Sequence, residues 1–306
     1  MPKFTQKFVL LSALLFALSL FPASAHNKIK VVASFSILAD LVKNIGGNNI
    51  SMTTFVGPNA NTHTYEPTPL DAQALRNAQI IFINGLHLEG FIDRLITASD
   101  TKALLVEVSA NIPTLEMKNQ EHDAHHHHHS VIDPHAWQTI PNVEIYVKNI
   151  AVAFCKIDPQ YCPLYNKNAE TYIKKLKTAQ ETLKTKIATI PEDKRIIITS
   201  HDAFGYFAKE YGFTILALQS ASTEAEATAA DVAKLIKQIK ANKAAALFVE
   251  NISNPRLIKQ ISKETGLKIG GTLYSDALSN ENGPAATYLD MMKHNVNTII
   301  DAIKKH

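Results

Sequence analysis

The sequence has few cysteines and almost no net charge, and both shortages narrow the possible functions. Its 306 residues include two cysteines, Cys155 and Cys162. A cysteine-built zinc fold needs more thiolates or adjacent histidines, so this class is not expected. The 31 basic and 28 acidic residues give a formal net charge of +3, whereas nucleic-acid-binding proteins usually carry a strongly basic face. We therefore expect no nucleic-acid partner.

The sequence also lacks any bilayer-spanning apolar run after its first 25 residues. Lysines precede an apolar run at 8–21, and Ala23 and Ala25 have the small side chains of a cleavage site. This pattern is typical of a secretory signal peptide at 1–25, and the run is too short for a transmembrane anchor. Because no cysteine lies near the cut to take a lipid, we predict an exported, soluble mature protein.

Export bears on the two cysteines, because an exported protein folds in an oxidising compartment. An isolated pair of cysteines close in sequence can form a bridge there. We therefore predict a disulfide between Cys155 and Cys162 that closes the turn around Asp158 and Pro159.

Short segments rich in β-branched residues recur along the chain and are predicted to be buried strands. They occupy 29–35, 50–56, 78–84, 102–108, 195–200, 213–219, 245–251 and 267–274. Amphipathic helical segments separate most of them, and this alternation is typical of parallel sheets covered on both faces. We therefore predict an α/β protein with one parallel sheet in each half of the chain.

A long amphipathic segment lies between the two sets of strands. Apolar residues recur along it at helical spacing, at Tyr172, Leu176, Ala179, Leu183 and Ile187. Its other face is rich in lysine, which we interpret as a solvated face, and prolines bound the segment. The predicted domains are an N-terminal lobe at 26–162, a rigid linking helix at 163–190 and a C-terminal lobe at 191–306.

Metal-capable side chains follow four of the predicted strands, where ligands of parallel α/β sheets gather. His63 follows the second strand, His135 the fourth, His201 the fifth and Asp276 the eighth. Together they would give Zn²⁺ its usual four nitrogen and oxygen ligands, whereas Ca²⁺ or Mg²⁺ would require mostly oxygens. The strand ends therefore predict a transition-metal site in the cleft between the lobes, enclosed by protein and with little room for a reactive water.

Taken singly, these residues have simpler interpretations. His63 could be an ordinary loop residue, and His135 could pack against Trp137. Asp276 could cap a helix, which is the commoner role of an aspartate after a strand. The joint pattern, and not any single residue, favours the metal site.

Other polar residues near the predicted ligands have open roles. Asp202 is interpreted as a cap for a helix starting near Ala203 or as a residue that supports a ligand. Glu66 could orient a ligand histidine or form a plain salt bridge. His87 could line the cleft or start a helix, and His294 is interpreted as a surface or packing residue of the last helix.

A histidine run interrupts the first half of the chain at 119–130. It contains His122, His125, His126, His127, His128 and His129. Such a polar run cannot bury itself, so we predict a mobile loop. We expect this loop to offer weak auxiliary metal sites that are separate from His135.

Long motifs of this chain resemble a known family. The segments NTHTYEPTP, DPHAW, TSHDAFGYFAKEYGF, ENISNPRLIKQISKETG and GGTLYSDALS are similar to the cluster A-I solute-binding proteins of ABC transporters, the ZnuA/TroA type. The resemblance covers essentially the whole mature chain. It implies two (β/α)₄ lobes joined by one long helix, with a transition metal bound between them. The ligand positions that it implies are His63, His135, His201 and Asp276.

The resemblance also bears on the metal. Members that resemble manganese binders usually carry Glu where this chain has His201, so this residue favours zinc. The predicted function is therefore a periplasmic, monomeric protein that captures Zn²⁺ and delivers it to an ABC transporter permease. Uptake of Mn²⁺ or Fe²⁺ on the same scaffold is the alternative, because three histidines and one aspartate can also hold Mn²⁺. A zinc hydrolase is less well supported, because the sequence has neither an HExxH helix nor a Gly-x-Ser-x-Gly elbow.

Overall fold

The structure is a computed structural model that describes residues 27–117, 132–242 and 244–305. The predicted signal peptide at 1–25 and the histidine run at 119–130 lie outside the described residues. Within the described ranges, no helix combines the length and the apolar character that crossing a membrane requires.

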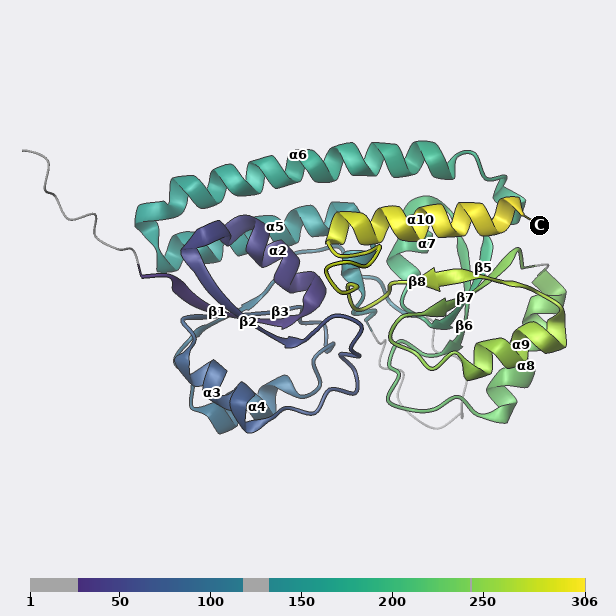
Figure 1. The fold of residues 1–306 in the computed structure, drawn as a ribbon, viewed down its shortest axis with the longest axis horizontal. Coiled ribbons are helices and arrows are strands. Elements are labelled where there is room, and N and C mark those ends of the chain that lie inside the picture. Colours follow the sequence, from purple (N-terminus) through teal and green to yellow (C-terminus); the bar gives the residue numbers. More distant parts are fainter. Residues whose placement is uncertain (1–26, 118–131, 243, 306) are drawn as a thin grey trace, which may run out of the picture.

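The first half of the chain forms a parallel four-stranded sheet in the order β2-β1-β3-β4. Its strands are β1 (Ile29–Phe35), β2 (Ile50–Val56), β3 (Ile80–Ile83) and β4 (Leu104–Glu107). The helices of this half are α2 (Ser36–Gly46), α3 (Pro69–Asn77), α4 (Ile92–Ser99) and α5 (Ile140–Ile157). In Figure 1, α3 and α4 lie on one side of the sheet, and α2 and α5 lie on the other.

The second half repeats this plan with a parallel sheet in the order β6-β5-β7-β8. Its strands are β5 (Ile196–His201), β6 (Thr214–Gln219), β7 (Ala246–Glu250) and β8 (Ile269–Leu273). Its helices are α7 (Gly205–Tyr211), α8 (Ala229–Asn242), α9 (Arg256–Thr265) and α10 (Tyr288–Lys304). The predicted α/β class with two parallel sheets is confirmed.

Only the central strands of each sheet are buried on both faces, as the sequence had predicted for all strands. Every residue of β3 is buried, whereas β4 alternates between half-buried and exposed positions, and Leu105 is 41% exposed. The prediction of full coverage was therefore wrong for the edge strands β2, β4, β6 and β8. An edge strand has a neighbour on one side only, so its apolar composition does not report full burial.

The long helix α6 (Cys162–Ile187) runs along both lobes in Figure 1 and packs against α5, α2 and α10. It begins at Cys162, with Pro163 in its first turn, and ends three residues before the predicted end. Of the predicted stripe, Ala179 is only partly buried, and the neighbouring Gln180 is buried in its place. Gln180 accepts a hydrogen bond from the Tyr211 hydroxyl at 2.6 Å, which attaches α6 to the second lobe.

A disulfide joins Cys155 near the end of α5 to Cys162 at the start of α6. The predicted pairing is therefore confirmed. The bridge closes the tight turn between these two helices, where Asp158 ends α5.

One apolar core extends through both lobes. It joins Phe35 and Trp137 of the first half to Phe207 and Tyr288 of the second. A smaller core fills the space between the second sheet and helices α8 and α9. The lobes are therefore packed on each other over a large common interior, which suits a rigid scaffold better than a wide hinge.

Candidate metal centre

The four predicted ligands lie at the carboxyl ends of their sheets and converge on one point. His63 is in the loop after β2, and its N–H donates to the Asn61 side chain at 2.9 Å. His135 precedes the short 3₁₀ helix η2 (Ala136–Gln138), and His201 is the last residue of β5. Asp276 lies in the loop after β8. Two separate sheets thus supply one group of side chains.

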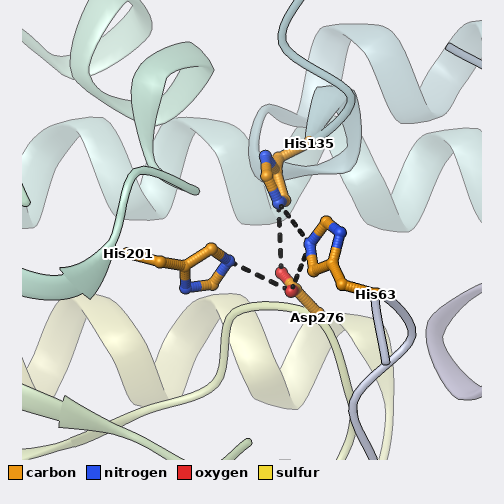
Figure 2. A group of neighbouring side chains, drawn as sticks. All are labelled: His63, His135, His201 and Asp276. Atoms are coloured by element: carbon orange, nitrogen blue, oxygen red, sulfur yellow. Dashed lines mark hydrogen bonds and ion pairs between the residues drawn. The ribbon is translucent and has the colours of Figure 1, made fainter. Parts of the chain in front are cut away.

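The distances within the group suit a single small cation. Asp276 Oδ2 lies 3.3 Å from His63 Nε2 and 3.1 Å from His201 Nε2, and its Oδ1 lies 3.6 Å from His135 Nε2. The Nε2 atoms of His63 and His135 are 3.4 Å apart, and Figure 2 shows the four side chains converging. Tetrahedral ligands about 2.0–2.1 Å from Zn²⁺ lie about 3.3–3.4 Å from one another. All three histidines therefore present Nε2 at ligand spacing.

The group is almost closed to solvent. His135, His201 and Asp276 are 0% exposed, and the side chain of His63 is 5% exposed. His63 also lines a cavity of about 670 Å³, together with His87 and Asp202. The group therefore meets this cavity through His63.

Two buried carboxylates hold the rings of the other two histidines. Asp133 Oδ1 lies 2.7 Å from Nδ1 of His135, and Glu250 Oε2 lies 2.6 Å from Nδ1 of His201. The Asp133 contact is a hydrogen bond, and the Glu250 contact is a close ion pair. A carboxylate beside Nδ1 favours a proton on that nitrogen and leaves the Nε2 lone pair free, which is the tautomer that a metal needs. The sequence prediction named neither carboxylate in this role, although Asp133 is part of the DPHAW motif.

The sequence leaves open the roles of Glu66 and Asp202 near the predicted ligands. Glu66 is exposed, and within the described ranges it makes no recorded hydrogen bond or ion pair with the ligand histidines. Asp202 does not cap a helix, because α7 begins at Gly205 with Phe204 as its N-cap and without a side-chain cap. The helix-cap interpretation of Asp202 was therefore wrong. The supporting roles of Asp202 and Glu66 stay predictions, and the carboxylates that contact the rings are Asp133 and Glu250. Asp202 lines the cavity beside His63.

The simpler roles considered for Asp276 and His135 do not remove them from the group. Asp276 caps no helix, because the N-cap of the next helix, α10, is Thr287. His135 does pack against Trp137, with ring centroids 5.3 Å apart, and this contact is compatible with its place in the group. His294 lies outside the group, near the Thr272 carbonyl.

The electrostatics of the group favour a bound cation. Burial disfavours the charged form of His201, but the charges of Glu250 and Asp276 outweigh this effect and raise its pKa well above the ordinary value. Burial likewise opposes ionisation of Asp276, but His201 and His135 outweigh it and lower the pKa of the carboxyl well below its usual range. Both pKa shifts favour positive charge between the imidazoles and the carboxylates, as expected for a site that binds a cation.

The arrangement defines a class of protein. Two α/β lobes, one connecting helix and a buried group of potential metal ligands between the lobes are the features of solute-binding proteins of metal ABC transporters, which are not enzymes. The model of the family described as zinc-uptake complex component A, periplasmic, matches residues 31–302, and the chain belongs to this family.

Relatives share the fold and carry different metals in their names. The manganese-binding lipoprotein MntA of Halalkalibacterium halodurans is 36% identical over 278 residues, which cover 90% of this chain and 89% of the relative. The iron-binding protein YfeA of Yersinia pestis is 34% identical, covering 91% and 87%. The solved structure of the periplasmic zinc-binding protein TroA of Treponema pallidum matches with a TM-score of 0.83 and 30% identity, covering 90% of this chain and 99% of that one.

Proposed function

We propose that this protein captures Zn²⁺ in the periplasm through His63, His135, His201 and Asp276 and delivers it to the permease of an ABC transporter. The observation that supports zinc is the third imidazole, His201 Nε2, which lies 3.1 Å from the Asp276 carboxylate. Three nitrogens and one oxygen within 4.8 Å of one another suit Zn²⁺, whereas Mn²⁺ prefers more oxygen ligands.

Uptake of Mn²⁺ or Fe²⁺ is the second candidate. The relatives named for manganese and iron binding support it. The two candidates predict different results when both metals are offered to the same protein.

Metal competition tests the proposal. The mature protein, purified without added metal, should contain about one zinc and should keep it against a large excess of Mn²⁺. The substitution His201→Glu should weaken Zn²⁺ binding and improve Mn²⁺ binding, because it replaces an imidazole by a carboxylate. The variant His294→Glu, at a histidine outside the group, is the matched control and should change neither affinity. Preference of the wild type for Mn²⁺ would refute the zinc proposal and support the second candidate.

The remaining expectations follow from this function. We propose a monomer with two partners, the metal ion and the permease, and with no nucleic acid. We also propose that His122 and His125 to His129 add weak metal sites outside the enclosed group.

A further inference from the structure

The loop that carries Asp276 follows β8 of the second lobe, yet residues of the first half of the chain hold it on both sides of the carboxylate. The Ser275 carbonyl accepts two hydrogen bonds, from Trp137 Nε1 at 2.8 Å and from Gln138 Nε2 at 2.7 Å. All three residues are fully buried. The element next to His135, η2, therefore holds the peptide that enters Asp276. The Trp137 carbonyl in turn accepts a hydrogen bond from the Tyr288 hydroxyl of α10 at 2.9 Å, so η2 also contacts the second lobe.

The loop is also attached to the first lobe beyond Asp276. The N–H of Leu278 donates to the Ser36 hydroxyl at 3.0 Å, and the Leu278 carbonyl accepts from the N–H of Asn59 at 2.9 Å. Leu278 is buried in the core that both lobes share. First-lobe groups therefore hold the chain on both sides of the carboxylate.

Contacts with the second lobe are fewer around the carboxylate itself. Asn295 of α10 binds both backbone groups of Tyr274, at 2.9 and 2.7 Å, where the chain leaves β8. Closer to Asp276, Asn251 donates to the Ala277 carbonyl at 3.2 Å, and the same amide also donates to Asn59 of the first lobe at 3.1 Å.

His201 has the opposite attachment. It pairs with Gln219 of β6, and its N–H and Nδ1 both meet the Glu250 carboxylate, at 2.9 and 2.6 Å. Thr199 donates to its carbonyl at 2.9 Å. These contacts all lie within the second sheet and fix His201 to it.

We infer that Trp137 and Gln138 are positioning residues that make Asp276 a first-lobe ligand. His63, His135 and Asp276 then form one preassembled set of three donors, and His201 alone arrives and leaves with the second sheet. The inference rests on the proposed ligand roles and extends them. Capture would begin on the three-donor set, His201 would complete the shell, and a small separation of the lobes would be enough to remove one ligand and loosen the metal.

Gln138→Met tests the hold on Asp276. The Gln138 Oε1 atom has no hydrogen-bond partner among the described residues, so the change removes a single hydrogen bond at nearly constant volume. Loss of a buried hydrogen bond corresponds to about a two- to tenfold change in an equilibrium constant, and we expect the zinc affinity to fall by about that factor. The control is Asn251→Ala, which removes the second-lobe contact with the same loop and the Asn59 contact as well. It should lower the affinity by less than about twofold.

Spectroscopy separates positioning from general destabilisation. The Co²⁺ form of Gln138→Met should show an altered visible spectrum while its melting temperature stays close to that of Asn251→Ala. A larger affinity loss for Asn251→Ala than for Gln138→Met would overturn the inference. Crystal structures with and without zinc give a second test. The Trp137–Ser275 contact should persist in both, and separation of Asp276 from His135 together with loss of that contact would also overturn it.

Failure of this inference can be distinguished from failure of the zinc proposal. If the wild type prefers Mn²⁺, zinc selectivity is refuted, and the same two variants are then ranked with Mn²⁺. The ranking depends on which lobe holds Asp276 and not on which metal is bound.

Discussion

Replacing Glu250 by glutamine is expected to weaken metal binding by placing His201 in the wrong tautomer. Glu250 Oε1 accepts the N–H groups of Ser200 and His201 at 2.7 and 2.9 Å, and Oε2 faces Nδ1 of His201 at 2.6 Å. In Glu250→Gln, the amide oxygen has to stay with the two backbone donors. The amide nitrogen then donates to Nδ1, so the ring proton moves to Nε2, the atom that faces Asp276.

The expected loss is about 10- to 100-fold in Zn²⁺ affinity, or about 1.4–2.8 kcal/mol. A hydrogen bond to a charged group contributes about 1.5–3 kcal/mol, which gives the same range. Competition against a chromophoric chelator at pH 7.5 measures the affinity. Nitrogen-15 NMR of the zinc-bound protein reports whether Nδ1 of His201 carries the proton.

Asp133→Asn provides the matched control. Asp133 Oδ1 accepts from both the N–H and the Nδ1–H of His135, at 2.9 and 2.7 Å. An amide oxygen can keep both bonds, while the new nitrogen takes the place of Oδ2 beside Gly205. The ring keeps its tautomer, so we expect a loss below about fivefold, from the missing charge alone. An equal or larger loss for Asp133→Asn, or an unchanged affinity for Glu250→Gln, would refute the tautomer argument.

Two further outcomes are expected. Acidification from pH 7.5 to 5 should weaken Zn²⁺ binding by about tenfold per pH unit for each proton that the metal displaces. The reason is that the metal must displace a proton from His201, whose pKa is raised. An affinity that does not change with pH, after correction for protonation of the chelator, would contradict this. Deletion of 119–130 should remove weak zinc sites and change the affinity of the tight site by less than about twofold. Glu116 and Ile132 already pair in an antiparallel bridge, so the shortened loop can still close. Loss of tight binding in an equilibrium titration would show that the histidine run belongs to the enclosed site.

The positions of the strands could be predicted because their sequences are short, apolar and β-branched. The predicted 29–35 and 50–56 are β1 and β2 without change, and the others shift by one or two residues at their ends. The exposure of β4 could not be predicted. Which strand lies at a sheet edge depends on strand order, and strand order is a long-range property.

The four donors could be found because the carboxyl ends of parallel strands meet at one edge of each sheet. The carboxylates behind the histidines were harder to find. Glu250 is 49 residues from His201 and reaches it only because β7 pairs with β5. Asp133 lies two residues before His135, so a search for acids next to each predicted ligand could have found it. The same search would also have selected Asp202, which lines the cavity beside His63.

The first lobe also has a buried carboxylate, Glu89, near the carboxyl ends of its central strands. Comparing it with Glu250 explains why a central strand ends in a metal ligand in the second lobe but not in the first. Glu89 accepts from the Ser34 hydroxyl and from the N–H of Asn84, both at 2.7 Å, and burial raises its pKa to about 7. The strand beside it ends in Phe35, which packs on Trp137. Glu89 therefore faces neutral donors only and serves the fold. In the second lobe the neighbouring strand ends in His201 where the first lobe has Phe35, so Glu250 faces an imidazole. A carboxylate in that position can orient the histidine for a metal.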